Sequence, residues 1–269
     1  MHHLALTSRR WLQGICACLA FATLPGILLA DEQPAGAQPT KVYAFITKRP
    51  DLTDEQFGAH WRDPHARLAL KSSLIRGYVQ NHPVDAALPG FPRMSRSGIA
   101  AIWVDGVDSL AKVTADPAYA EVHEDELNLL DRASLQFLIT QEHTLVGGPS
   151  AEDPLAVPTK AMLFLRRGEG VAADRMTAVV RRVARAGRAM NHGHRIICAF
   201  PAPGAYGEND APAYDAVIEF YFPTRAAFEE AWRRSGPALL RRLESAADLS
   251  RSDGFLATEE RKRWSPFGH

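Results

Sequence analysis

The sequence is poor in cysteine, in net charge and in long apolar runs, and each shortage argues against a class of protein. Cys16 and Cys18 lie near the N-terminus, so a chain that loses a leader keeps only Cys198 and has no internal disulfide. The formal net charge is zero and no long run of like charges occurs, which gives no indication of a nucleic-acid partner. The longest apolar stretch, residues 15–29, is shorter than the roughly 20 residues that a comfortable membrane span needs.

Several sequence signatures of enzymes are also missing. No Gly-x-Ser-x-Gly elbow, phosphate-binding loop or dinucleotide-binding glycine pattern occurs. Histidines are present as His60, His65, His82 and in residues 192–194, but no carboxylate-rich or cysteine pattern completes a tetrahedral set of ligands. We therefore expect no metal and no other cofactor.

The first 37 residues have the composition of an export leader. A basic head containing Arg9 and Arg10 precedes the apolar stretch, and Asp31 begins a polar exit. The Ser-Arg-Arg-Trp-Leu run at residues 8–12 resembles a twin-arginine signal, which implies the twin-arginine export machinery as a partner and a periplasmic or secreted location. Cleavage after Ala30 and cleavage after Ala37 both fit, and an uncleaved anchor is the alternative.

The rest of the chain contains an internal repeat with an offset of about 119 positions. Residues 40–46 align with residues 159–165, and residues 137–142 align with residues 255–260. The repeat predicts two units, 40–147 and 158–264, joined by a linker rich in proline and glycine at 147–158.

The first unit predicts the order strand, helix, strand, strand, helix, strand, which is the ferredoxin-like split unit. Thr53 and Gln56 predict a capping box, and Pro64 predicts a kink or a restart of the helix with Asp63 as the new cap. An apolar sheet face must be covered, so we expect the two units to pack sheet to sheet. The predicted segments are strands at 42–47, 75–82, 99–104 and 134–140, and helices at 51–70, 107–114 and 119–130.

Two motifs in the first unit resemble a known family. Phe-Gly-Ala-His-Trp-Arg-Asp-Pro-His at residues 57–65 and Arg-Gly-Tyr-Val-Gln-Asn-His at residues 76–82 resemble the EthD-like proteins of the dimeric α+β barrel superfamily, and Asp105 also fits. The resemblance covers roughly residues 40–146, whereas the second unit shares the fold pattern without the motifs. It implies an α+β fold of two tandem ferredoxin-like units that form an intramolecular dimeric α+β barrel.

His65 is the predicted catalytic residue, as a general acid or base at the mouth of an apolar barrel. Trp61 lies four residues earlier and shares its helix face. Tyr78 and His82 share one face of a strand and Asn81 lies on the other. We expect Trp61, Tyr78, Asn81 and His82 to bind the substrate. A structural role for His65 and a position of Tyr78 at the rim are the alternatives.

The repeat predicts one site per chain. His65 falls on Ala184, Trp61 on Val180 and Tyr78 on Ile197, so the second unit has lost the polar members of the motif. Alternatively, neither unit is active and the first keeps an old packing pattern.

Three functions remain open from the sequence. The family resemblance implies a small hydrophobic or aromatic ligand and cofactor-independent chemistry of dehydratase, tautomerase or oxygenase type. The alternatives are a non-catalytic periplasmic ligand-binding protein and a haem-associated protein. The sequence also leaves open whether two chains form a homodimer.

Overall fold

The computed structural model of the chain describes residues 39–146, 159–190, 194–207 and 210–263. The expected leader, the linker at 147–158 and His192 lie outside these residues. We call residues 39–146 the first half and the described residues from 159 to 263 the second half.

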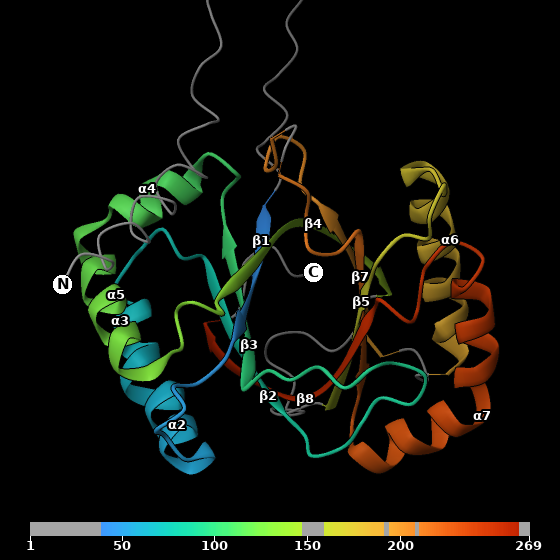
Figure 1. Cartoon of the computed structure of the whole chain (residues 1–269), viewed down its shortest axis with the longest axis horizontal. Coiled ribbons are helices and arrows are strands. Elements are labelled where there is room, and N and C mark those ends of the chain that lie inside the picture. The colour runs from blue at the N-terminus through green and yellow to red at the C-terminus, as the bar shows by residue number, and fades with distance from the viewer. Residues whose placement is uncertain (1–38, 147–158, 191–193, 208–209, 264–269) are drawn as a thin grey trace, which may run out of the picture.

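Eight antiparallel strands form one closed barrel, in the order β1-β3-β2-β8-β5-β7-β6-β4 (Figure 1). The first half thus contributes the order β4-β1-β3-β2 and the second half the order β8-β5-β7-β6. The strand pairs β2–β8 and β4–β6 join the two halves at their edges. The strands are β1 (Thr40–Ile46), β2 (Gly77–Pro83), β3 (Gly98–Val104), β4 (Gln136–Val146), β5 (Thr159–Leu165), β6 (Ile196–Pro201), β7 (Ala216–Phe222) and β8 (Asp253–Arg263).

Helices cover the outside of the barrel on two opposite flanks (Figure 1). No helix in the described ranges is long and apolar enough to cross a membrane. The first half supplies α2 (Asp54–His60), a π-helical turn (Trp61–His65), α3 (Ala66–Ala69), α4 (Ser109–Ala115) and α5 (Pro117–Leu129). The second half supplies α6 (Ala173–Ala186), a 3₁₀ turn (Gly187–Ala189) and α7 (Arg225–Leu243).

The predicted α+β class is confirmed. The Thr53–Gln56 capping box is present. Pro64 does not restart the helix with Asp63 as a cap; the chain accommodates it in a π-helical turn, and Asp63 pairs with Arg67 instead. Strand β4 runs to Val146 rather than residue 140, because its second part pairs with β6 across the junction of the halves.

One end of the barrel interior is charged rather than apolar. The Glu219 carboxylate on β7 lies 2.8 Å from Lys41 Nζ on β1 and 3.4 Å from Lys160 Nζ on β5. Glu142 lies 3.0 Å from Lys41, and Glu259 lies 2.6 Å from Lys160. Burial alone would raise the pKa of Glu219, but Lys160 and Lys41 hold it well below its usual range. These ion pairs compensate charges that would otherwise be costly to bury.

Aromatic side chains contact the buried charges at this end of the barrel. Tyr43 and Tyr221 donate hydrogen bonds to the Glu219 carboxylate, at 2.7 and 2.9 Å. Lys41 Nζ also lies 4.7 Å from the centre of the Trp103 ring. The opposite end is apolar and includes Phe45 and Phe164. The interior is therefore packed with side chains.

The segment between β2 and β3 anchors the first half to the second. It contains no named helix or strand, yet Leu88, Phe91 and Met94 are buried. Trp232 Nε1 on α7 donates a hydrogen bond of 3.2 Å to the Pro89 carbonyl. Together with the shared strand edges, this contact indicates that the halves unfold as one unit.

Glu219→Gln should lower the free energy of unfolding by about 3 kcal/mol, because it removes the charge that compensates two buried lysines. Urea unfolding measures the change. The control is Glu229→Gln on α7, whose pair with Arg225 is exposed and whose loss should change stability by less than about 0.5 kcal/mol. Equal effects of the two substitutions would show that the interior charges do not hold the barrel together.

Candidate functional site

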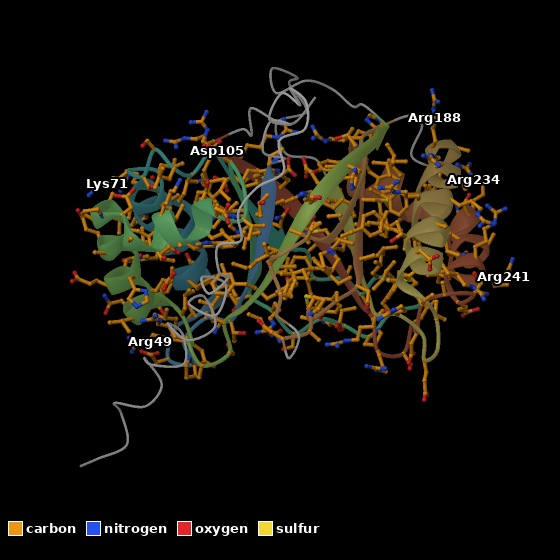
Figure 2. The ribbon with its side chains drawn as sticks, turned by 90° about the horizontal axis from the view of Figure 1, so that it is seen from above. Arg49, Lys71, Asp105, Arg188, Arg234 and Arg241 are labelled. Atoms are coloured by element: carbon orange, nitrogen blue, oxygen red, sulfur yellow. The ribbon has the colours of Figure 1, made fainter. Side chains whose placement is uncertain are left out.

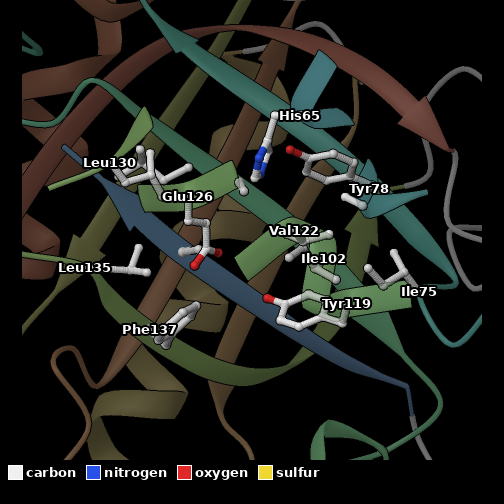
Figure 3. A pocket seen from close by; sticks show the side chains of 14 residues that line it. His65, Ile75, Tyr78, Ile102, Tyr119, Val122, Glu126, Leu130, Leu135 and Phe137 are labelled. Atoms are coloured by element: carbon white, nitrogen blue, oxygen red, sulfur yellow. The ribbon is translucent and has the colours of Figure 1, made fainter. Parts of the chain in front are cut away.

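A cavity of about 40 Å³ lies outside the barrel, between the outer face of the first-half sheet and the helices α3 and α5 (Figure 3). Its walls are mostly apolar, and its volume leaves room for only a few heavy atoms without side-chain movement. The apolar lining is Ala44, Ile46, Ala69, Ile75, Ala100, Ile102, Val122, Leu130, Leu135 and Phe137.

Four polar side chains reach this cavity from three elements. His65 comes from the π-helical turn, Tyr78 from β2, and Tyr119 and Glu126 from α5 (Figure 3). Helix α5 begins at Pro117 because the Asp116 side chain caps it, accepting from the amide of Ala118. Tyr119 and Glu126 are seven residues apart, so they lie on one face of the helix.

His65 is oriented by a carboxylate. Its Nδ1 lies 2.8 Å from Asp125 Oδ2, and the second Asp125 oxygen lies 2.7 Å from His60 Nε2. The hydrogen bond from His65 holds the pKa of Asp125 below its usual range, so Asp125 is an ionised acceptor. A neutral His65 then carries its proton on Nδ1, which leaves the Nε2 lone pair for the cavity.

The pKa of the neighbouring Glu126 carboxyl group is shifted in the opposite direction from that of Asp125. Burial raises the pKa of Glu126, although a protonated His65 and the Arg132 guanidinium oppose this. Its Oε2 lies 3.5 Å from His123 Nδ1 and 3.7 Å from Arg132 Nε. Burial also raises the pKa of Tyr78 to about 12, so its hydroxyl stays protonated. The cavity thus combines a base with a protonated hydroxyl group and a carboxyl group whose pKa is raised.

Trp61 does not line the cavity. It is fully buried, stacks on Phe57 with ring centres 5.4 Å apart, and covers Gly98, where a side chain would collide with the indole. The centre of its ring also lies 4.7 Å from the centre of the His82 ring. Trp61 therefore packs the helix against the sheet beside His65.

Asn81 and His82 also lie away from the cavity. Asn81 faces the barrel interior and donates a hydrogen bond of 2.8 Å to the Ile99 carbonyl. His82 Nε2 lies 3.4 Å from Glu260 Oε2, yet burial and the nearby Arg62 lower the pKa of His82 to about 4. The structure thus brings together His65 and Tyr78 of the predicted site residues, and their roles remain proposals.

The corresponding space in the second half is filled. Strand pairing places Leu163 where the first half has Ala44, Ile218 at the position of Ala100, and Phe220 at the position of Ile102. All three larger side chains belong to the apolar core under α6 and α7.

The pairing also corrects the repeat alignment by one residue. Tyr78 pairs with Ile102 as Ile196 pairs with Phe220, so Ile196 rather than Ile197 is the counterpart of Tyr78.

Sequence reasoning missed Asp125, Glu126 and Tyr119. Asp125 lies sixty residues from His65 in the chain, so no local pattern connects them. Glu126 left a signal, because its spacing from Val122 and Leu129 places a carboxylate on the apolar face of the helix. Within the described residues, no group of three or more His, Cys, Asp or Glu side chains could hold a metal ion.

Residues 49–133 match the family model of the EthD domain. No curated protein matches the sequence.

Solved structures share the dimeric α+β barrel fold at low sequence identity, and this likeness concerns the fold alone. An anthrone oxidase-like protein is 13% identical with a TM-score of 0.55, over 85% of this chain and 94% of that chain. A candidate monooxygenase from Lactobacillus acidophilus is 8% identical with a TM-score of 0.53, over 86% and 97%. Another from Fusobacterium nucleatum is 6% identical with a TM-score of 0.56, over 87% and 97%.

The low pKa of His82 predicts that this residue lowers the free energy of unfolding in acid. Between its unfolded value near 6.5 and its folded value of about 4, the unfolded chain binds the proton more readily, so stability falls as the pH falls. His82→Gln should remove on the order of 1–2 kcal/mol of the stability loss between pH 7 and pH 4.5. Urea unfolding at both pH values gives this difference, and parallel losses in the two proteins would contradict it.

Proposed function

We propose that the chain binds a small, largely apolar carbonyl compound in the cavity beside His65 and moves a proton within it. One observation carries this proposal: an ionised Asp125 holds Nδ1 of His65, which leaves the other ring nitrogen for an apolar cavity. The arrangement supports a general base, because the carboxylate fixes the tautomer and stabilises the imidazolium that forms.

The chemistry that fits these groups is tautomerisation or dehydration. His65 Nε2 takes a proton from the carbon next to the carbonyl, and the electrons of that C–H bond form the C=C bond. Glu126 in its acid form gives a proton to the carbonyl oxygen, which yields the enol. Return of one proton from His65 to Glu126, through solvent, resets the site. In a dehydration, Glu126 instead protonates the departing hydroxyl group.

The location and the origin of the fold complete the proposal. We infer that the protein acts outside the cytoplasm, on the strength of the twin-arginine leader. We also infer that the two halves are tandem ferredoxin-like units and that the second serves as a scaffold. The matched strand orders of the halves and the filled space under α6 support this inference.

His65→Gln should slow catalysed proton exchange about 100-fold or more, which is a typical contribution of a general base. The assay follows deuterium incorporation next to the carbonyl of acetone in D₂O by NMR. Acetone has few heavy atoms and suits a cavity of about 40 Å³. The matched control is His143→Gln, which should leave exchange unchanged, since His143 lies on β4 beside Phe200 and does not line the cavity.

The outcomes of this assay separate the candidate functions. Exchange that is unchanged in His65→Gln would reject His65 as the base. Acetone binding to the wild-type protein without exchange above the buffer rate would instead indicate a non-catalytic binding protein.

A further inference from the structure

Gln80 is a fully buried amide on β2, between the π-helical turn and Tyr78. By strand alternation its side chain lies on the same face of β2 as those of Tyr78 and His82. Its Nε2 donates a hydrogen bond of 2.6 Å to the Trp61 carbonyl and another of 3.1 Å to the Tyr78 hydroxyl. The side-chain amide of Gln80 therefore donates to the π-helical turn, which contains His65, and to Tyr78 itself.

The first of these hydrogen bonds supports the turn that presents His65. Pro64 has no N–H, so it cannot contribute to the helical hydrogen bonds. The amide of Ala66, just after the turn, donates a hydrogen bond to the carbonyl of Asp63. Gln80 supplies a donor to the Trp61 carbonyl at the start of the turn, four residues before His65.

The second hydrogen bond sets the direction of the Tyr78 hydroxyl. An oxygen that accepts from Gln80 keeps its own proton available for another acceptor. Tyr78 lines the cavity, and its hydroxyl projects toward the His65 imidazole (Figure 3). The amide thus favours Tyr78 as a hydrogen-bond donor into the cavity.

The second half provides an internal comparison. Gln80 pairs with Ala100 as Cys198 pairs with Ile218, so Cys198 holds the equivalent position. Cys198 is buried in the apolar core against helix α6, which contains neither proline nor a π-helical turn. The buried amide therefore occurs in the half that has the turn and the tyrosine.

Packing alone does not explain Gln80. Its Oε1 is buried and has no hydrogen-bond partner in the described part of the chain. An unpaired buried oxygen costs free energy, and an apolar side chain of the same length would avoid that cost.

We propose that Gln80 is a positioning residue, which holds the turn beneath His65 and directs the Tyr78 hydroxyl into the cavity. The catalytic consequence rests on the function proposed above, whereas the effect of Gln80 on the geometry of His65 does not.

The test is Gln80→Met, which keeps the chain length and removes both donors. The readout is the NMR titration of the His65 ring, which needs neither substrate nor turnover. We expect the His65 chemical shifts and titration midpoint to differ from the wild-type values, and acetone exchange to fall at least tenfold. Cys198→Ala, at the equivalent buried position, should leave both unchanged.

Gln80→Glu covers the case in which the methionine variant does not fold. A protonated carboxyl donates one hydrogen and an ionised one donates none. The His65 shifts should therefore depart further from the wild-type values as that carboxyl ionises.

Wild-type His65 shifts and titration in either folded variant would overturn the positioning role. A wild-type protein without exchange activity would reject the proposed function alone, because the titration would still report on Gln80.

Discussion

The buried bridge of Glu219 to Lys41 and Lys160 is the constraint on which the barrel depends. It links β7 to β1 and β5, strands from both halves, with every side chain inside the closed sheet. A charge in this interior is tolerated only with its partners, so the three strands must meet in one register. The same packing leaves the interior to structural side chains and places the candidate site on the outer face, under the helices.

The two halves build different outer faces on the same frame. Small residues such as Ala44 and Ala100 leave room in the first half, where Leu163 and Ile218 fill it in the second. The first half also has polar side chains on this face. His65 is hydrogen-bonded to Asp125, and Gln80 donates hydrogen bonds to the Trp61 carbonyl in the π-helical turn and to the Tyr78 hydroxyl. The outer faces of the two halves thus differ in the volume and polarity of a few side chains at matching strand positions.

Much of the fold could be predicted because local patterns encode it. Alternation placed Tyr78 and Asn81 on opposite faces of β2, and the Thr53 capping box fixed the start of α2. The site was harder to predict, because the partner of His65 lies on a distant helix and its contact depends on packing. The charged barrel interior was missed because Lys41 and Lys160 begin strands, where a lysine is usually solvated.

The position of the cavity is the central claim, and one ligand titration tests it directly. Acetone would be added to protein labelled at the histidine rings and the tryptophan indoles, with NMR shifts recorded for His65 and for Trp103 inside the barrel. We expect saturable shifts at His65 and none at the Trp103 indole. Shifts at Trp103 with an unperturbed His65 would place the ligand inside the barrel and contradict this account.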